Sequence, residues 1–185
     1  MGISYEMPDF HFSETHCKDG KFISKDVINT TIDTPPSTQP STPPSTQPST
    51  DDENFWIDRG FRLMGKEPSE AYGGDVEASE PIHCFEEALK KNPKSMTAHY
   101  GKACAEFNAG EYSDVEHSIA KALGIDEYDP RIWYIRSVLS AHGNDYNDVK
   151  YCFEFIRDLE NVTKSDREKI KEVLDSVEKI LNQSK

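Results

Sequence analysis

Histidine and cysteine side chains near the start of the chain are the first candidates for chemistry, because both residue types bind transition metals. His11, His16 and Cys17 stand close together. They supply only three ligands, whereas a structural zinc site takes four, and no second Cys/His pair stands at the usual spacing. The sequence therefore predicts no metal site at these residues.

Catalytic constellations are equally hard to assemble from this sequence. It holds no Gly-rich phosphate loop, no Gly-x-Ser-x-Gly elbow and no His-Glu-x-x-His helix. Asp126, Glu127 and Asp129 form an acidic cluster, but the Gly and the closing Glu of a calcium loop are missing. A lone histidine on a helix is more often a packing or surface residue than a general base, and four stand on predicted helices: His83, His99, His117 and His142. We therefore predict that the chain is not an enzyme and has no catalytic residue and no cofactor.

The charge of the chain restricts its partners. Asp and Glu number 34 against 21 Lys and Arg, so the formal net charge is −13. Nucleic-acid binding needs a basic surface that displaces counterions from phosphates, and anionic membranes attract basic segments. No apolar run is long enough to span a bilayer. We expect neither nucleic-acid nor membrane binding, and any electrostatic preference favours a protein or peptide partner with basic character.

Cysteine usage indicates the compartment. The chain has no Cys-x-x-Cys pair, and its four cysteines are widely spaced: Cys17, Cys84, Cys104 and Cys152. This pattern is typical of reduced thiols in the cytosol. The first residues also lack the basic and apolar parts of a secretory signal. We therefore expect a cytoplasmic protein.

Composition divides the chain into parts. Residues 35–50 read Pro-Pro-Ser-Thr-Gln-Pro-Ser-Thr twice. This stretch has almost no apolar surface to offset the entropy of ordering, so we predict a disordered Pro/Ser/Thr linker over residues 34–52. A proline-motif ligand or a phosphorylation target is the alternative interpretation of the same stretch. Residues 1–33 carry scattered apolar residues without a sustained period, which predicts a flexible tail.

A period of 34 residues organises the rest of the chain. It relates three sets of positions: Phe85, Ile119 and Phe153; Ala88, Ala122 and Ile156; and Pro81, Val115 and Val149. Such a period predicts stacked helical units, each of which buries its apolar face against a neighbour. Residues 161–185 carry one apolar stripe at helical spacing, and Ser165 with Glu168 fits a capping box at its start.

Particular stretches carry a family resemblance. Glu80–Pro93 looks like the second helix and closing proline of a tetratricopeptide repeat, and Trp56 and Trp133 stand where such a repeat opens with an aromatic residue. Residues 53–160 thus resemble the tetratricopeptide repeat family, although the first unit is about ten residues longer than the family's. The resemblance implies an all-α, right-handed solenoid of about three antiparallel helical hairpins, with residues 161–185 as a capping helix.

Repeats of this family bind peptides or helices along a concave face built from the first helix of each unit. Carried over by position, that groove would contain Asn54, Ile57, Phe61, Met64, Asn108, Arg131, Tyr134, Val138 and His142. Its apolar walls would suit an amphipathic helix or an extended apolar segment. The alternative is that the apolar members are simply core, because periodicity does not distinguish core from groove. The resemblance implies a protein-binding scaffold or adaptor, with a regulatory subunit of one fixed partner as the alternative.

The tail offers an occupant for this groove. Phe10, Phe12, Phe22 and Ile23 are apolar side chains tethered to the repeat domain through the linker. Such a tether raises their effective concentration to about the millimolar range. We therefore hypothesise that the tail docks in the groove and competes there with the partner.

Overall fold

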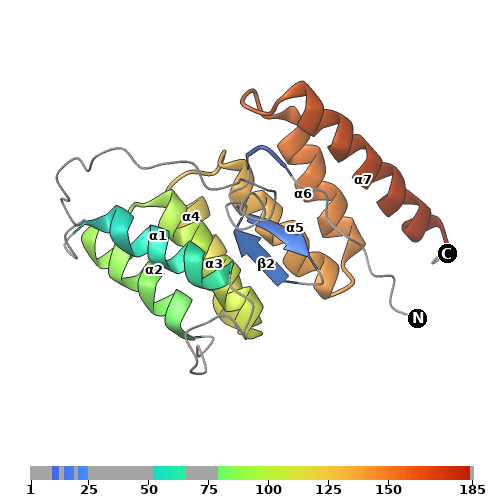
Figure 1. Cartoon of the computed structure of the whole chain (residues 1–185). Coiled ribbons are helices and arrows are strands. Elements are labelled where there is room, and N and C mark those ends of the chain that lie inside the picture. Colours follow the sequence, from blue (N-terminus) through green and yellow to red (C-terminus); the bar gives the residue numbers. More distant parts are fainter. Residues whose placement is uncertain (1–9, 13–14, 19–20, 25–51, 66–78, 184–185) are drawn as a thin grey trace, which may run out of the picture.

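The computed structural model describes residues 10–12, 15–18, 21–24, 52–65 and 79–183 (Figure 1). Within these ranges the chain forms seven α-helices and a two-stranded ribbon. The helices are α1 (Glu53–Met64), α2 (Ser79–Lys91), α3 (Met96–Ala109), α4 (Tyr112–Leu123), α5 (Pro130–His142), α6 (Tyr146–Asp158) and α7 (Lys164–Gln183). The predicted helical class is therefore confirmed for the described part of the chain, while nearly all of the predicted linker lies outside it.

The ribbon falls in the part of the sequence for which no strand was predicted. It pairs β1 (Thr15–Lys18) antiparallel to β2 (Lys21–Ser24). A two-stranded ribbon is only marginally stable alone in water. Here β2 contacts α1 and α3, and this support from the helices explains how so short a ribbon forms.

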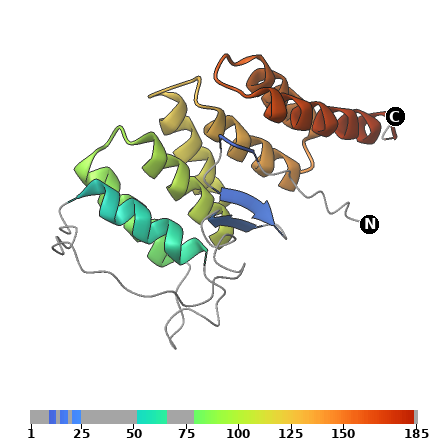
Figure 2. The same cartoon turned by 45° about the horizontal axis from the view of Figure 1, so that its top comes forward.

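Consecutive helices pack against one another along the whole helical part. Within this series α1 packs on α2, α3 on α4 and α5 on α6, and α7 covers α6 at the C-terminal end (Figure 1). Alternate helices also meet, because α3 contacts both α1 and α5 (Figure 2). The first helices of the three pairs therefore share one side of the molecule.

Polar caps and glycines set the ends of these helices. The Ser95 side chain accepts the N–H of Ala98 at 3.3 Å, and α3 begins at Met96, directly after Ser95. Asp129 accepts the N–H of Arg131 at 2.9 Å, ahead of the Pro130 that opens α5. Gly110 ends α3 with a φ of 80°, a left-handed conformation that glycine adopts without steric cost. Local sequence thus determines where these helices begin and end.

The start of α7 differs from the prediction by two residues. Thr163 Oγ1 accepts the N–H of Asp166 at 3.1 Å and donates to Asp166 Oδ2 at 2.8 Å. Thr163 and Asp166 therefore form the capping pair, and the pair predicted from Ser165 and Glu168 is wrong. Both pairs have the same spacing, but the Asp166 side chain is 1% exposed whereas Ser165 and Glu168 face solvent. Tertiary contacts select between two equivalent sequence patterns.

Phe85 packs where α1, α2 and α3 meet. Its ring is fully buried, and a Cβ atom on Gly60 would lie 2.7 Å from it. A Cβ atom on Gly101 would overlap the same ring. Helices α1 and α3 approach Phe85 this closely because both positions lack a side chain. Phe153, which the period of 34 relates to Phe85, is fully buried in the same way.

The main core extends from α3 and α4 through α5 and α6 to α7. Tyr100, Ile132, Tyr134 and Phe153 are among its largest side chains. Phe10 from the N-terminus belongs to the same cluster. No helix in the described ranges has the length and apolar character needed to cross a membrane.

Candidate functional site

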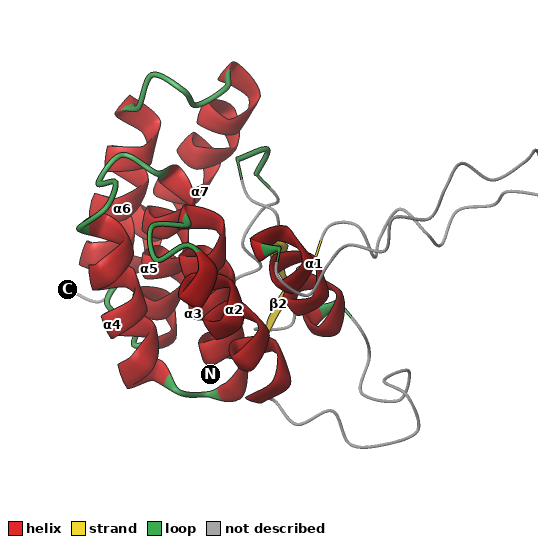
Figure 3. Ribbon diagram, turned by 90° about the vertical axis from the view of Figure 1, so that its left-hand side faces the viewer, coloured by secondary structure: helices red, strands yellow, loops and turns green. Residues whose placement is uncertain are grey.

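The N-terminal segment, defined as the described residues 10–12, 15–18 and 21–24, lies on the side that α1, α3 and α5 share. β2 runs beside α1 and α3 (Figure 2, Figure 3), while Phe10 and Phe12 reach Tyr134 on α5. We call the surface formed by α1, α3 and α5, together with the parts of α6 and α7 that contact Phe10, the inner face. The hypothesis that Phe10 and Phe12 dock on the helices agrees with this geometry, whereas the side chains of Phe22 and Ile23 lie outside the described residues.

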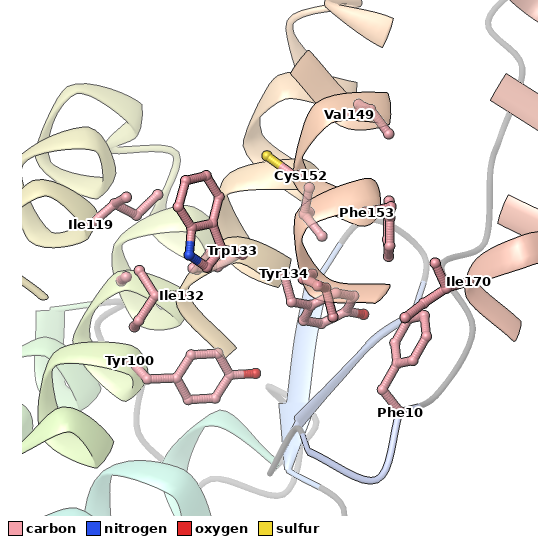
Figure 4. Close-up of a cluster of buried hydrophobic side chains, with 14 of the residues drawn as sticks. Phe10, Tyr100, Ile119, Ile132, Trp133, Tyr134, Val149, Cys152, Phe153 and Ile170 are labelled. Atoms are coloured by element: carbon pink, nitrogen blue, oxygen red, sulfur yellow. The ribbon is translucent and has the colours of Figure 1, made fainter. Parts of the chain in front are cut away.

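Phe10 fills a site built by three different helices. Its ring is 1% exposed and stands 5.4 Å from that of Tyr134 on α5 and 5.8 Å from that of Phe153 on α6, centroid to centroid. Ile170 of α7 lies beside it (Figure 4). Phe12 stacks on Phe10 at 4.9 Å with an interplanar angle of 16°. The two rings therefore enter the helical core as one unit.

Asp166 provides the polar half of this site. Its Oδ1 accepts the backbone N–H of His11 at 3.1 Å, and the His11 Nδ1 lies 2.9 Å from the same oxygen. Burial would raise the pKa of the Asp166 carboxyl, but hydrogen bonds from His11 and Thr163 outweigh it and hold that pKa below its usual value. The buried carboxylate is therefore charged near neutral pH and available to hold the segment.

The predicted groove residues on α1 lie at different depths. Asn54 is exposed and donates from its side chain to Asp52 at 3.2 Å, next to the cap of the helix. Ile57 is partly exposed. Phe61 packs edge-on against Phe85 at 5.1 Å, and Met64 packs against the main core. Asn54 is therefore the exposed member of this group, while Ile57, Phe61 and Met64 are each partly buried.

The predicted residues on α3 and α5 divide in the same way. Tyr134 and Val138 are buried in the core, and Tyr134 is the groove residue that contacts the N-terminal segment. Asn108 is partly exposed. Arg131 pairs with Asp129 at 2.7 Å and also donates to Thr97 at 3.0 Å. The core alternative therefore describes Val138 better than the groove prediction does.

His142, also predicted for the groove, lies instead at a pocket lined by α4, α5 and α6. Its ring lies 4.2 Å from that of Tyr112, at an open pocket of about 670 Å³ between α4, α5 and α6. Ile119, Leu123 and Leu139 form apolar lining of this pocket. The sequence did not indicate the pocket, because its lining residues come from three helices, α4, α5 and α6, and share no common spacing.

A charged pair with a fixed geometry lines part of this pocket. Arg136 donates to Asp148 at 2.6 Å and 3.1 Å, and Ser140 donates to Asp148 at 2.6 Å. Burial would raise the pKa of Asp148, but these hydrogen bonds lower it overall. The pocket wall therefore holds a charged carboxylate whose hydrogen bonds are already made within the chain.

An aromatic cluster formed by α5, α6 and the residues just before α5 was not predicted either. Trp133 packs against Phe155 at 4.3 Å, and Tyr128 stacks on Phe155 at 6.4 Å. Tyr151, which is 53% exposed, meets the edge of Trp133 at 5.9 Å. The Arg136 guanidinium stands 5.2 Å from the Trp133 ring centroid, which adds a cation–π contact.

The three cysteines in the described ranges, Cys84, Cys104 and Cys152, are buried within the helices. Burial and the neighbouring Asp148 carboxylate raise the pKa of Cys152 to about 12, and burial likewise raises the pKa of Cys84. The described residues hold no group of three or more His, Cys, Asp or Glu that could bind a metal ion. The side chains of His16 and Cys17 lie outside the described residues. What the site provides is a set of apolar and polar contacts for a chain segment.

Comparison with known proteins adds no relative. No family model matches this chain, and no curated protein or solved structure is significantly similar to it. The likeness to tetratricopeptide repeats therefore remains a prediction from the sequence.

Proposed function

We propose that this chain is a protein-binding module in which the inner face holds a peptide or helix of a partner. The observation that carries the proposal is the burial of Phe10 and its neighbours against α5, α6 and α7. A chain segment far from these helices in the sequence already finds both apolar and hydrogen-bonding contacts there. Burying an aromatic side chain of this kind contributes about 1.5–3 kcal/mol.

The proposed architecture is a solenoid of three tetratricopeptide-like hairpins, α1–α2, α3–α4 and α5–α6, capped by α7. Three features support it: consecutive packing of the helices, contact between the first helices of neighbouring pairs, and burial of Phe85, Ile119 and Phe153 at a spacing of 34. In such a stack the first helices line one continuous face. That face carries the N-terminal segment in this chain.

The proposed partner is a protein segment with basic and amphipathic character. Its apolar side would pack on the inner face, and the net charge of −13 would attract its basic side. We place the protein in the cytoplasm, on the evidence of its widely spaced cysteines. The role that follows is that of an interaction scaffold or adaptor.

A regulatory subunit with one fixed partner is the second candidate function. The docked N-terminal segment favours it, since an occupied face binds a partner only when that segment gives way. The two candidates differ in a simple observation. A regulatory subunit purifies with a single partner at fixed stoichiometry, whereas a scaffold recovers several.

The test uses the full chain as bait in a lysate of its native cell, with Ile57→Glu as the altered inner face. Ile57 is partly exposed on α1, so a new charge there opposes apolar contact without entering the core. Asn147→Glu is the matched control, because it adds the same charge at an exposed position on α6. Captured proteins are identified by mass spectrometry at low and high salt.

The proposal expects a partner that survives high salt, is lost with Ile57→Glu and is retained with Asn147→Glu. Binding of the purified partner to each variant then gives the dissociation constants. A set of captured proteins that Ile57→Glu leaves unchanged would count against the inner face. Complete loss of all proteins at high salt would reduce the interaction to non-specific attraction by an acidic surface.

A further inference from the structure

Resting on the proposed function, the contacts of the N-terminal segment also define which kind of partner the inner face accepts. We propose that the N-terminal segment, through residues 10–12, is a displaceable internal ligand. The partner that replaces them carries two aromatic side chains separated by one residue, with a neutral or basic residue between them. Phe10, His11 and Phe12 are this chain's own copy of that pattern.

The apolar requirement comes from the two rings. Phe10 is 1% exposed, and the rings of Tyr134 and Phe153 surround it at 5.4 Å and 5.8 Å. Phe12 is only partly buried; it stacks on Phe10 and meets the edge of Tyr134 at 6.2 Å. These distances fall in the range where aromatic pairs attract beyond their buried area. One deep and one shallow aromatic side chain are therefore needed.

The polar requirement comes from Asp166. This carboxylate accepts a backbone N–H, that of His11, and a backbone donor is available from every residue except proline. The His11 Nδ1 stands 2.9 Å from the same Oδ1, so a neutral donor or a cation is suited to the central position. A carboxylate there would face the buried charge of Asp166 and be repelled. The Thr163 hydroxyl donates to the other oxygen of this carboxylate at 2.8 Å and so orients it from within α7's own first turn.

The side chain of Lys169 gives this site a further preference. Its Nζ lies 6.0 Å from the centroid of the Phe10 ring, within the range of a cation–π contact. Such a contact needs the ring of an aromatic side chain, and an aliphatic side chain does not provide it. It therefore favours Phe, Tyr or Trp over Leu or Ile at the deep position.

Displacement is possible because of how the segment is attached. Residues 25–51 join it to α1, so its release breaks no helix of the bundle. A tether of this kind holds its ligand at an effective concentration on the order of 1 mM. A free peptide of equal intrinsic affinity would therefore bind the native chain weakly and would bind much better once the internal copy is disabled.

The experiment measures binding of a labelled peptide that copies residues 7–24 by fluorescence anisotropy. The receptors are the full native chain and the full chain with Phe10→Ser and Phe12→Ser. We expect at least tenfold tighter binding to the substituted chain. The same peptide carrying both serine substitutions should bind neither receptor. Equal binding of the native peptide to both receptors, or unchanged binding of the serine peptide, would overturn the proposal.

The central position is tested with a peptide carrying His11→Glu. It should bind the substituted chain at least tenfold more weakly than the native peptide does. Adding Asp166→Asn to the receptor should reduce that difference to about threefold or less, because the repulsion is then gone. A penalty for His11→Glu that is the same with and without Asp166 would show that this carboxylate does not select the central residue.

A chain that fails to fold after loss of Phe10 is covered by a second design. A protease site placed within residues 35–50 of the otherwise native chain allows the N-terminal piece to be cut free after folding. On dilution below micromolar concentration, the labelled peptide should exchange with that piece. A piece that stays bound without exchange would be a permanent part of the core, and the proposal would be wrong.

Two further outcomes separate this inference from the proposed function. A cellular partner captured equally by the native chain and by the Phe10→Ser, Phe12→Ser chain would refute the internal ligand and leave the proposed function standing. Peptide exchange without any captured partner would support the internal ligand and refute the proposed function. A native chain that dimerises on concentration, and does so no longer after these substitutions, would assign the site to a second copy's segment and overturn the proposal.

Discussion

The Asp166 carboxylate accepts the backbone N–H of His11 at 3.1 Å, although the two residues are 155 positions apart in the sequence. This bond joins the N-terminal segment to the first turn of the last helix. The same carboxylate also bonds the Thr163 hydroxyl, so one buried side chain serves both as a helix cap and as an anchor for the segment. Removing it should therefore affect two parts of the structure at once.

Asp166→Asn should lower the free energy of unfolding at pH 7 by about 1.5–3 kcal/mol, the usual value for hydrogen bonds to a charged group. The folded state holds the pKa of Asp166 below its usual value. As the pH falls, the unfolded chain therefore binds the proton first, and the contribution of Asp166, complete above about pH 5, is lost progressively below it. Urea unfolding at several pH values measures the difference between the two proteins. A difference that does not shrink in acid would contradict this account.

Thr163→Ala should destabilise the protein by about 1 kcal/mol, because the hydroxyl satisfies an N–H of the first turn of α7. Ser165→Ala, two residues away and exposed, should change the unfolding free energy by no more than about 0.5 kcal/mol. Chemical denaturation of the two variants compares the rival caps directly. The reverse order of effects would restore Ser165 as the cap.

Gly101→Ala should destabilise the protein by about 1–3 kcal/mol, because its new methyl group would overlap the buried Phe85 ring. The higher helix propensity of alanine offsets only about 1 kcal/mol of this cost. Gly143→Ala is the control, since the nearest atom to its Cβ would stand 3.6 Å away, at ordinary contact distance. Thermal or urea unfolding that ranks the two variants equally would show that α3 can move away from Phe85.

The buried residues that could be predicted from the sequence are those that recur at a spacing of 34. Phe85, Ile119 and Phe153 share a spacing, and all three are buried. Periodicity carries this information because each helical unit faces its neighbour in the same way. For the groove, the carry-over from the family included Tyr134, which the structure places next to Phe10, and Asn54, which is exposed. It also included Val138, which is buried in the core, because a periodic sequence pattern does not tell how deeply a side chain is buried.

The N-terminal contacts were hypothesised but could not be located, since a single buried ring such as Phe10 has no periodicity. A local signal for the ribbon was nevertheless present. The dipeptide Asp19-Gly20 stands between the segments that form β1 and β2, and Asp-Gly is among the strongest short-range indications of a hairpin. The cap at Thr163 needed tertiary information, because only the contact of Asp166 with His11 distinguishes it from Ser165.

Cys152 should resist alkylation in the folded protein. Burial and Asp148 raise the pKa of its thiol to about 12, so at pH 8 only about one thiol in ten thousand is ionised, even where a reagent can enter. Labelling by iodoacetamide should therefore require opening of α6. Val149→Ala, which removes buried methyl groups from the same helix, should accelerate labelling about tenfold for each 1.4 kcal/mol of stability lost. Mass spectrometry of Cys152 over time, with urea-unfolded chain as the reference, gives these rates. Labelling in the native chain as fast as in the unfolded one would show that α6 leaves this thiol open to solvent.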